Sequence, residues 1–353
     1  MAKIIELEKD KVSFIKSLRR FFQSGKLNFL IGSGASVPAI NPGGNIETEL
    51  TTLYKGLPQQ ETEYNKKLYS FLSGIQSVQN ALIDELFEQE KIKQTIEYYK
   101  KFIDNLTRLL LLRNNNLMPK RINIFSTNYD MFVEKACEYV SPLHVNDGFE
   151  RRCSLSPHNA HFSSHTFSQS LQNMGDYYKS EIPTINILKI HGSLSWHPDT
   201  KNTDLLVFSN KKIPDLSDIE KNNIDKLKEY NDNFKSIILP NPGKLENTVL
   251  VRTYYDLLRI YSNELDKENS VLFVFGFSFN DEHIFEITKR SLKNPSLEIV
   301  IFAFNDSAKE DLARKFSDFS NVSIVFKSDN GKLNFEALNN ILSEIKTFEA
   351  NNG

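Results

Sequence analysis

Four apolar segments of this chain each end abruptly in small or polar residues, and this feature constrains the fold most. The segments occupy residues 29–36, 125–130, 190–193 and 275–281. Each apolar run has the length of a buried strand. Because parallel strands present their carboxyl ends at one edge of a sheet, where ligands bind, the four ends predict one shared ligand site.

The last third of the sequence alternates between strand-like and helix-like stretches. We expect strands at residues 271–275, 297–304 and 322–326, and helices at residues 281–292, 307–316 and 334–348. Strands that are apolar on both faces and alternate with helices are typical of a parallel sheet covered on both sides. The sequence therefore predicts an α/β fold, a doubly wound Rossmann-like parallel sheet with an inserted helical module.

The inserted module is expected between the strands of this sheet. Residues 61–113 have helical spacing of apolar positions throughout, and residues 218–234 are highly charged and helical in pattern. Residues 141–180 mix His, Ser, Asn and Gly without a clear period and are expected to form a loop over the site. We expect one domain over residues 1–350, in which residues 45–118 and about 141–235 form the smaller module.

Composition excludes several classes of protein. A formal charge of −2 over 353 residues means that the sequence has no excess of positive charge to attract nucleic acid. Two cysteines form neither a disulfide scaffold nor a four-thiolate zinc site, which indicates a reducing compartment. Apolar runs fall far short of the ~20 residues of a membrane helix, and the start lacks the apolar core of a secretory signal. We expect a cytoplasmic protein that binds neither nucleic acid nor membrane directly.

A glycine-rich turn, Gly32, Ser33, Gly34, Ala35 and Ser36, follows the first of the four runs. Glycines let the backbone approach a pyrophosphate, and the amides and dipole of a following helix offer positive potential. The full dinucleotide fingerprint is absent, because a valine replaces its third glycine. An ordinary tight turn therefore remains the alternative.

The second of the four segments ends in Thr127, Asn128 and Asp130, which lie between a strand and a helix. Asn and Asp are favoured at helix starts, so one of the three is expected to cap that helix. Capping does not require all three residues. The neutral amide of Asn128 is suited to hold a water or a ribose hydroxyl in place.

The third of the four segments contains His191, which lies at the end of a strand and precedes Gly192. A lone histidine is more often structural than catalytic. General bases nevertheless sit at strand ends, and the ordinary pKa of histidine lies near neutrality. His191 is therefore our candidate general base, with Gly192 leaving it an open approach to a ligand.

The fourth of the four segments places Gly276 and Ser278 between a strand and a helix. The nucleophile elbow of serine hydrolases occurs in the same context. We reject that interpretation, since Asn280 replaces the second glycine of the elbow and only His283 follows the serine. Ser278 is better explained as a phosphate or ribose contact. Asn280 or Asp281 is expected to cap the next helix.

One histidine-rich stretch contains Cys153, His158, His161 and His165. The last two have the i, i+4 spacing of paired metal ligands, but the segment lacks helical signals and a carboxylate partner. We expect a polar surface loop and no metal site.

Taken together and in this order, the segments resemble the sirtuin (silent-information-regulator) superfamily. Sirtuin deacylases carry a zinc ribbon with four cysteines, whereas this chain has two. The chain is therefore more similar to the zinc-free, sirtuin-like NAD hydrolases of bacterial anti-phage systems. The residues that carry the resemblance are Gly32, Gly34, Ser36, Thr127, Asn128, Asp130, His191, Gly192, Gly276 and Ser278.

The resemblance implies an enzyme that cleaves the bond between nicotinamide and ribose in NAD, depleting NAD in abortive-infection defence. Asn128 would position the ribose and a water, His191 would act as general base, and Asp130 would contact the carboxamide. The residues expected to bind the dinucleotide are Gly32, Ser33, Gly34, Ala35, Ser36, Thr127, Asp130, Gly276, Phe277, Ser278 and Asn305.

The same resemblance implies partners. We expect NAD as substrate, no metal, a homo-oligomer and a separate partner protein such as a ring-forming ATPase. Two other functions remain open. One is a module that senses NAD or ADP-ribose without turnover, and the other is a protein deacylase or ADP-ribosyltransferase.

Overall fold

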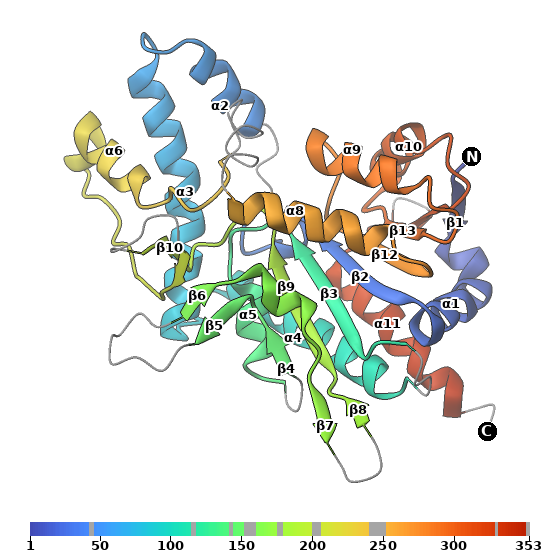
Figure 1. The fold of residues 1–353 in the computed structure, drawn as a ribbon. Helices are drawn as coiled ribbons and strands as arrows, with labels where there is room; N and C mark the ends of the chain where they lie inside the picture. Colours follow the sequence, from blue (N-terminus) through green and yellow to red (C-terminus); the bar gives the residue numbers. More distant parts are fainter. Residues whose placement is uncertain are drawn as a thin grey trace.

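The protein is built on one eight-stranded sheet in which every neighbouring pair is parallel (Figure 1). The computed structural model describes residues 1–41, 46–113, 118–140, 144–151, 160–174, 179–199, 206–239, 252–328 and 331–350. In spatial order the strands are β1 (Lys3–Glu6), β14 (Val322–Phe326), β13 (Glu298–Phe302), β12 (Ser270–Phe275), β2 (Lys26–Ile31), β3 (Arg121–Ser126), β9 (Thr184–Lys189) and β4 (His144–Asn146). The predicted α/β class is confirmed.

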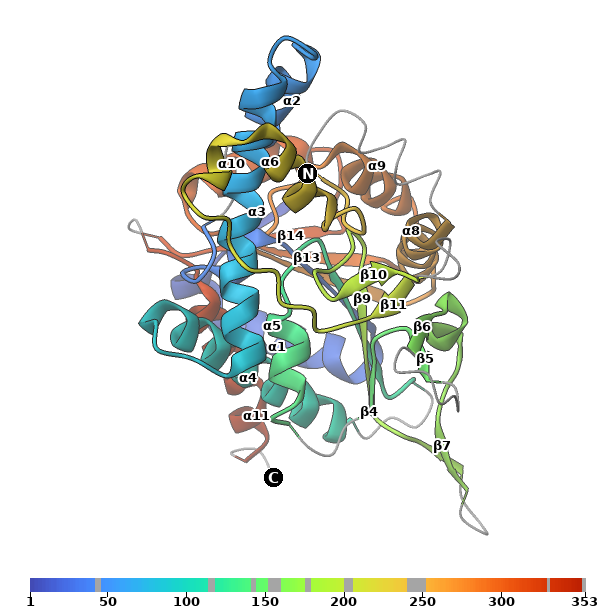
Figure 2. The same ribbon diagram turned by 90° about the vertical axis from the view of Figure 1, so that its left-hand side faces the viewer.

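Helices cover both faces of this sheet (Figures 1 and 2). Side chains alternate between faces along a strand, so Phe29 and Ile31 join one hydrophobic cluster while Leu30 joins the other. Among the described residues, none of the helices is apolar over a length that would cross a membrane. The first cluster includes α1 (Leu7–Ser24), α4 (Glu90–Leu111), α5 (Phe132–Cys137) and α11 (Phe335–Ala350), and the second includes α8 (Arg252–Leu265), α9 (Glu282–Ser291) and α10 (Asp306–Lys315).

A helical module stands to one side of the sheet, made of α2 (Ile46–Lys55), α3 (Glu61–Asp84) and α6 (Ile224–Asp232). The sequence predicts that residues 45–118, with their helical stretch at 61–113, belong to this module. The structure breaks that stretch at Glu85, whose φ of 56° ends α3 in the left-handed region. After the break, α4 packs on the sheet, with Tyr99 and Phe102 in the first cluster. The apolar stripe predicts a buried helix face but not what covers it.

The middle of the chain differs from the expected helices and loops, because it contains short antiparallel strands. One small sheet has the order β10 (Trp196–Pro198), β11 (Leu206–Phe208), β6 (Ala160–Phe162) and β5 (Phe149–Arg151), and β7 (Gln172–Met174) pairs with β8 (Lys179–Glu181) as a hairpin. Single 3₁₀ turns occur at η1 (Ser33–Ser36), η2 (Ser164–Ser168) and η3 (Glu220–Asn222). Strands of three residues are too short to show an alternating pattern, so the sequence did not reveal them.

Candidate functional site

The four polar segments leave the sheet side by side. They follow β12, β2, β3 and β9, which are consecutive neighbours in the sheet. The last residues of these strands pair across the sheet at one level: Phe275 with Ile31, Ile31 with Ser126, and Ser126 with Lys189. The ladder continues one residue further, where Gly32 N donates to Phe275 O over 3.1 Å and Thr127 N donates to Ile31 O over 3.0 Å. The sequence therefore delivers its polar segments to one edge.

The glycine turn packs directly against Gly276. Gly34 N donates to Gly276 O over 2.9 Å, and Gly276 has a φ of +67°, which favours glycine. A Cβ on Gly32 would lie 2.5 Å from Gly276 O, and a Cβ on Gly276 would lie 2.5 Å from Ala35 N. The glycines thus permit a backbone-to-backbone junction between two loops. Since the amides of Gly32, Gly34 and Ala35 donate within the protein, a role of this turn toward pyrophosphate stays a prediction.

The amide of Asn128 is held in a buried network. Its Nδ2 donates to Gly32 O over 3.0 Å and to Ser36 Oγ over 3.1 Å, and the residue is 7% exposed. Ser36 Oγ donates to Asp130 Oδ2 over 2.7 Å and lies 3.2 Å from the hydroxyl of Tyr99. Burial and the Asp130 charge raise the pKa of Tyr99 well above its ordinary value, so the phenol stays neutral. Asn128 is therefore fixed in orientation before any ligand binds.

Asp130 also contacts the next helix, from two residues before its first residue. Its Oδ1 accepts a hydrogen bond from Phe132 N, the first residue of α5, over 3.2 Å. The prediction that one of Thr127, Asn128 and Asp130 caps this helix is wrong, because the cap position is Met131 and its side chain makes no capping bond. The buried Lys189 contacts this segment as well. Its Nζ donates to the Asp130 carbonyl and forms an ion pair with Glu134 Oε1 at 3.6 Å. Burial raises the pKa of the Glu134 carboxyl above its ordinary value.

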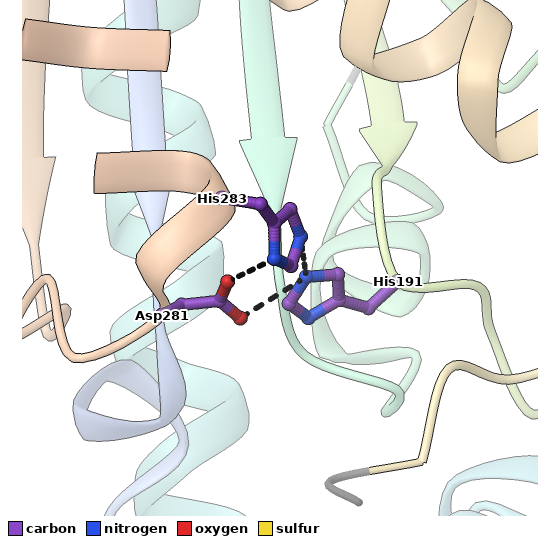
Figure 3. A group of neighbouring side chains, drawn as sticks. All are labelled: His191, Asp281 and His283. Atoms are coloured by element: carbon purple, nitrogen blue, oxygen red, sulfur yellow. Dashed lines mark hydrogen bonds and ion pairs between the residues drawn. The ribbon is translucent and has the colours of Figure 1, made fainter. Parts of the chain in front are cut away.

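His191 meets two side chains from a distant part of the sequence. Its Nε2 lies 3.2 Å from Nε2 of His283 and 3.4 Å from Oδ2 of Asp281 (Figure 3). His283 Nδ1 in turn lies 2.5 Å from Asp281 Oδ1. His191 follows β9, whereas Asp281 and His283 stand at the start of α9, after β12. Because β2 and β3 lie between those strands, this His–Asp–His cluster joins the outer two of the four polar segments.

Asp281 and His283 are absent from the predicted site. Asp281 occupies the cap position of α9 that we expected for it or Asn280, but its side chain makes no capping bond and contacts the imidazoles instead. The sequence suggests His283 only as a member of a serine-hydrolase triad, which is rejected above. An acid and a histidine two residues apart, directly after a polar strand end, are the signal that could have identified them.

The His–Asp–His cluster has the donors of a metal site. The three donor atoms lie within 4.8 Å of one another, and two imidazoles with one carboxylate suit zinc or iron. The three side chains also contact one another directly: His191 contacts both His283 and Asp281, and His283 contacts Asp281. The histidine-rich stretch looks different, since His161 pairs with Asp199 at 2.8 Å and His165 is exposed. Cys153 and His158 lie outside the described residues.

Three more of the residues expected to bind the dinucleotide lie at the same edge. Ser278 is exposed, and its carbonyl accepts from Lys315 Nζ over 2.8 Å. Phe277 packs against Phe279, with ring centroids 5.0 Å apart. Asn305 follows β13, the neighbour of β12, and caps α10 by accepting from Ala308 N over 2.9 Å. Their contacts to a nucleotide stay predictions.

Comparison with known proteins gives one finding. A family model described as "SIR2-like domain" matches residues 122–324, from β3 to β14. The matched range contains the segments after β3, β9 and β12, while the glycine turn after β2 precedes it. A search of curated proteins gives no match.

Proposed function

The chain belongs to the SIR2-like domain family, whose members are generally NAD-dependent enzymes, and from this premise we propose that it hydrolyses NAD to nicotinamide and ADP-ribose. One observation supports this most. Asn128 and His191 each lie two residues beyond Ser126 and Lys189, which pair with each other on the neighbouring strands β3 and β9. The residues that carry an amide and an imidazole therefore follow neighbouring strands at the edge where a parallel sheet binds its ligand.

The chemistry needs few groups. Nicotinamide leaves as a neutral molecule from a cationic precursor, so the protein supplies orientation, stabilisation of an oxocarbenium-like ribose and a placed water. As the C1′–N bond breaks, its electron pair goes to the nicotinamide nitrogen. The water oxygen bonds to C1′, and the released proton goes to His191. Asn128, held rigidly by Gly32 and Ser36, would orient the ribose and the water.

The rest of the dinucleotide would lie along the strand ends. In this proposal the turn of residues 32–36 faces the pyrophosphate, and Asp130 contacts the carboxamide. Gly276, Ser278 and Asn305 would hold the adenosine side. The order of β13, β12, β2, β3 and β9 supports this direction, because it runs from the adenosine residues to the reacting residues.

Unrestrained NAD hydrolysis would exhaust the cofactor of a cell, so we propose that the activity is gated. A homo-oligomer, or a separate partner such as a ring-forming ATPase, would supply the gate in a cytoplasmic, abortive-infection response to phage. Incubating the protein with NAD, alone and with candidate partners, identifies which one releases the activity.

Substitution of Asn128 and His191 tests the function. We expect Asn128→Ala and His191→Ala to lower nicotinamide release at least ~100-fold, in keeping with the usual contribution of acid–base groups. His191→Ala should still bind NAD, which at 100 times Kd stabilises the fold by about 2.7 kcal/mol. The matched control is His165→Ala, since His165 is exposed and lies in η2. Full activity in both site variants would refute the assigned roles.

Other outcomes would assign the site differently. Tight binding of NAD without product over hours, with every candidate partner present, would indicate a sensor of NAD or ADP-ribose. Consumption of NAD that depends on an acyl-lysine peptide or another acceptor would indicate a deacylase or ADP-ribosyltransferase. A chain with two cysteines lacks the four zinc ligands of the deacylase ribbon.

A further inference from the structure

We propose that Asp281 and His283 are positioning residues that set the tautomer of His191, so that its Nδ1 takes the proton during hydrolysis. The proposal rests on the proposed function, because it refines the role of His191 as general base. It concerns which nitrogen of the ring carries a hydrogen before the substrate arrives.

The first step concerns His283. An ionised carboxylate only accepts hydrogen bonds and repels a lone pair, so the 2.5 Å ion-pair contact between His283 Nδ1 and Asp281 Oδ1 favours a hydrogen on Nδ1. A neutral imidazole carries one N–H. His283 Nε2 is therefore the acceptor nitrogen of that ring.

The second step concerns His191. Two nitrogens 3.2 Å apart share a hydrogen bond only if one of them donates, and with His283 Nε2 as acceptor the donor is His191 Nε2. The contact of 3.4 Å from His191 Nε2 to Asp281 Oδ2 points the same way. An N–H there is attracted to the carboxylate, whereas a lone pair would be repelled. Both contacts place the hydrogen on Nε2.

The third step follows from the ring itself. With its hydrogen on Nε2, His191 carries its basic lone pair on Nδ1, on the side of the ring turned away from His283 (Figure 3). When Nδ1 takes the proton of the attacking water, the ring becomes a cation whose Nε2–H already faces a carboxylate. His191 and Asp281 are 3% and 7% exposed, so little water screens that attraction.

The arrangement follows a general logic in which a base is oriented by a third group. Removing the orienting carboxylate of such a set leaves the wrong tautomer and costs up to ~10⁴ in kcat. We expect a loss of about 100-fold in kcat for Asp281→Asn and for His283→Ala, with KM for NAD changed less than about threefold. The matched control is Glu282→Gln, because this neighbouring carboxylate is exposed and should leave both constants unchanged.

A spectroscopic measurement tests the tautomer without relying on turnover. In the full chain labelled with ¹⁵N-histidine, which has seven histidines, the signal of His191 is the one lost in His191→Ala. We expect a protonated Nε2 and an unprotonated Nδ1 in the unsubstituted protein. Asp281→Asn should shift this signal toward a mixture of tautomers while the melting temperature shows an intact fold.

The outcomes separate this proposal from the proposed function. A hydrogen on Nδ1 of His191 overturns the positioning role whether or not NAD is hydrolysed. So does unchanged kcat in both variants, or a loss confined to KM, which would indicate substrate contact. A stoichiometric divalent metal bound to His191 Nε2 would occupy the place of the hydrogen and also overturn it. Absence of turnover together with the expected tautomer would instead count against the proposed function alone.

Discussion

Single side chains at this site bind several partners each. Ser36 is 1% exposed, and its one oxygen lies within hydrogen-bonding distance of groups on Asn128, Asp130 and Tyr99. The sequence suggested Ser36 as part of a phosphate-binding turn. Its observed contacts orient the amide of Asn128, and a role toward phosphate stays a prediction. At the scale of the residue, the small hydroxyl links the glycine turn to the proposed reacting group.

Substitution of Ser36 measures this link. Ser36→Ala removes the donor to the buried Asp130 carboxylate, and leaving such a group unsatisfied costs about 1–3 kcal/mol. We expect that loss in the free energy of unfolding by urea, together with slower nicotinamide release because Asn128 loses one contact. Ser33→Ala is the control, since Ser33 is exposed in the same turn and should stay within ~0.5 kcal/mol. Equal losses in the free energy of unfolding for the two substitutions would contradict the network.

Elements meet at this site through backbone as well as through side chains. The loop after β12 and the turn after β2 approach so closely that both need glycine at the contact. Gly192 has the same requirement beside β9, since its φ is +83° and a Cβ would lie 2.4 Å from Ser236 O. Three of the four strand ends thus depend on residues without a side chain.

Two glycines of opposite environment test the packing of these elements. Gly276→Ala places a methyl group against Ala35 N at a positive φ, and such strain costs about 1–3 kcal/mol before any clash is counted. Gly74→Ala in α3 meets nothing within 4 Å and should stabilise the protein by roughly 0.5–1 kcal/mol. We expect shifts of melting temperature in opposite directions. A neutral Gly276→Ala would show that the loops are not packed as described.

The whole molecule combines a parallel sheet buried on both faces with small units, such as a two-stranded hairpin, that lie outside it. The strands β2, β3, β9 and β12 are covered on both faces by apolar clusters. The hairpin of β7 and β8 pairs with no other strand among the described residues. A two-stranded hairpin is marginal by itself in water. Stability is therefore unevenly distributed over the fold.

Hydrogen exchange should show that distribution. We expect amides of the four central strands to exchange only near the free energy of global unfolding, because their hydrogen bonds are buried on both faces. Amides of β7 and β8 should exchange at least ~100-fold faster, because local opening of a small unit requires little free energy. Mass spectrometry of peptides covering each strand measures both. Protection of the hairpin equal to that of β2 would contradict this picture.

The sequence by itself determined the α/β class, the strands that lead to the site and the polar residues at their ends. Those features are local, since burial on both faces makes a strand continuously apolar, and polar residues mark where burial stops. Tertiary structure alone decided the strand order, the face that α4 covers and the meeting of His191 with His283, 92 positions apart. The physical reason is that such contacts depend on how elements pack in space. The chain's local periodicity specifies which surfaces are apolar or polar but not which of them meet.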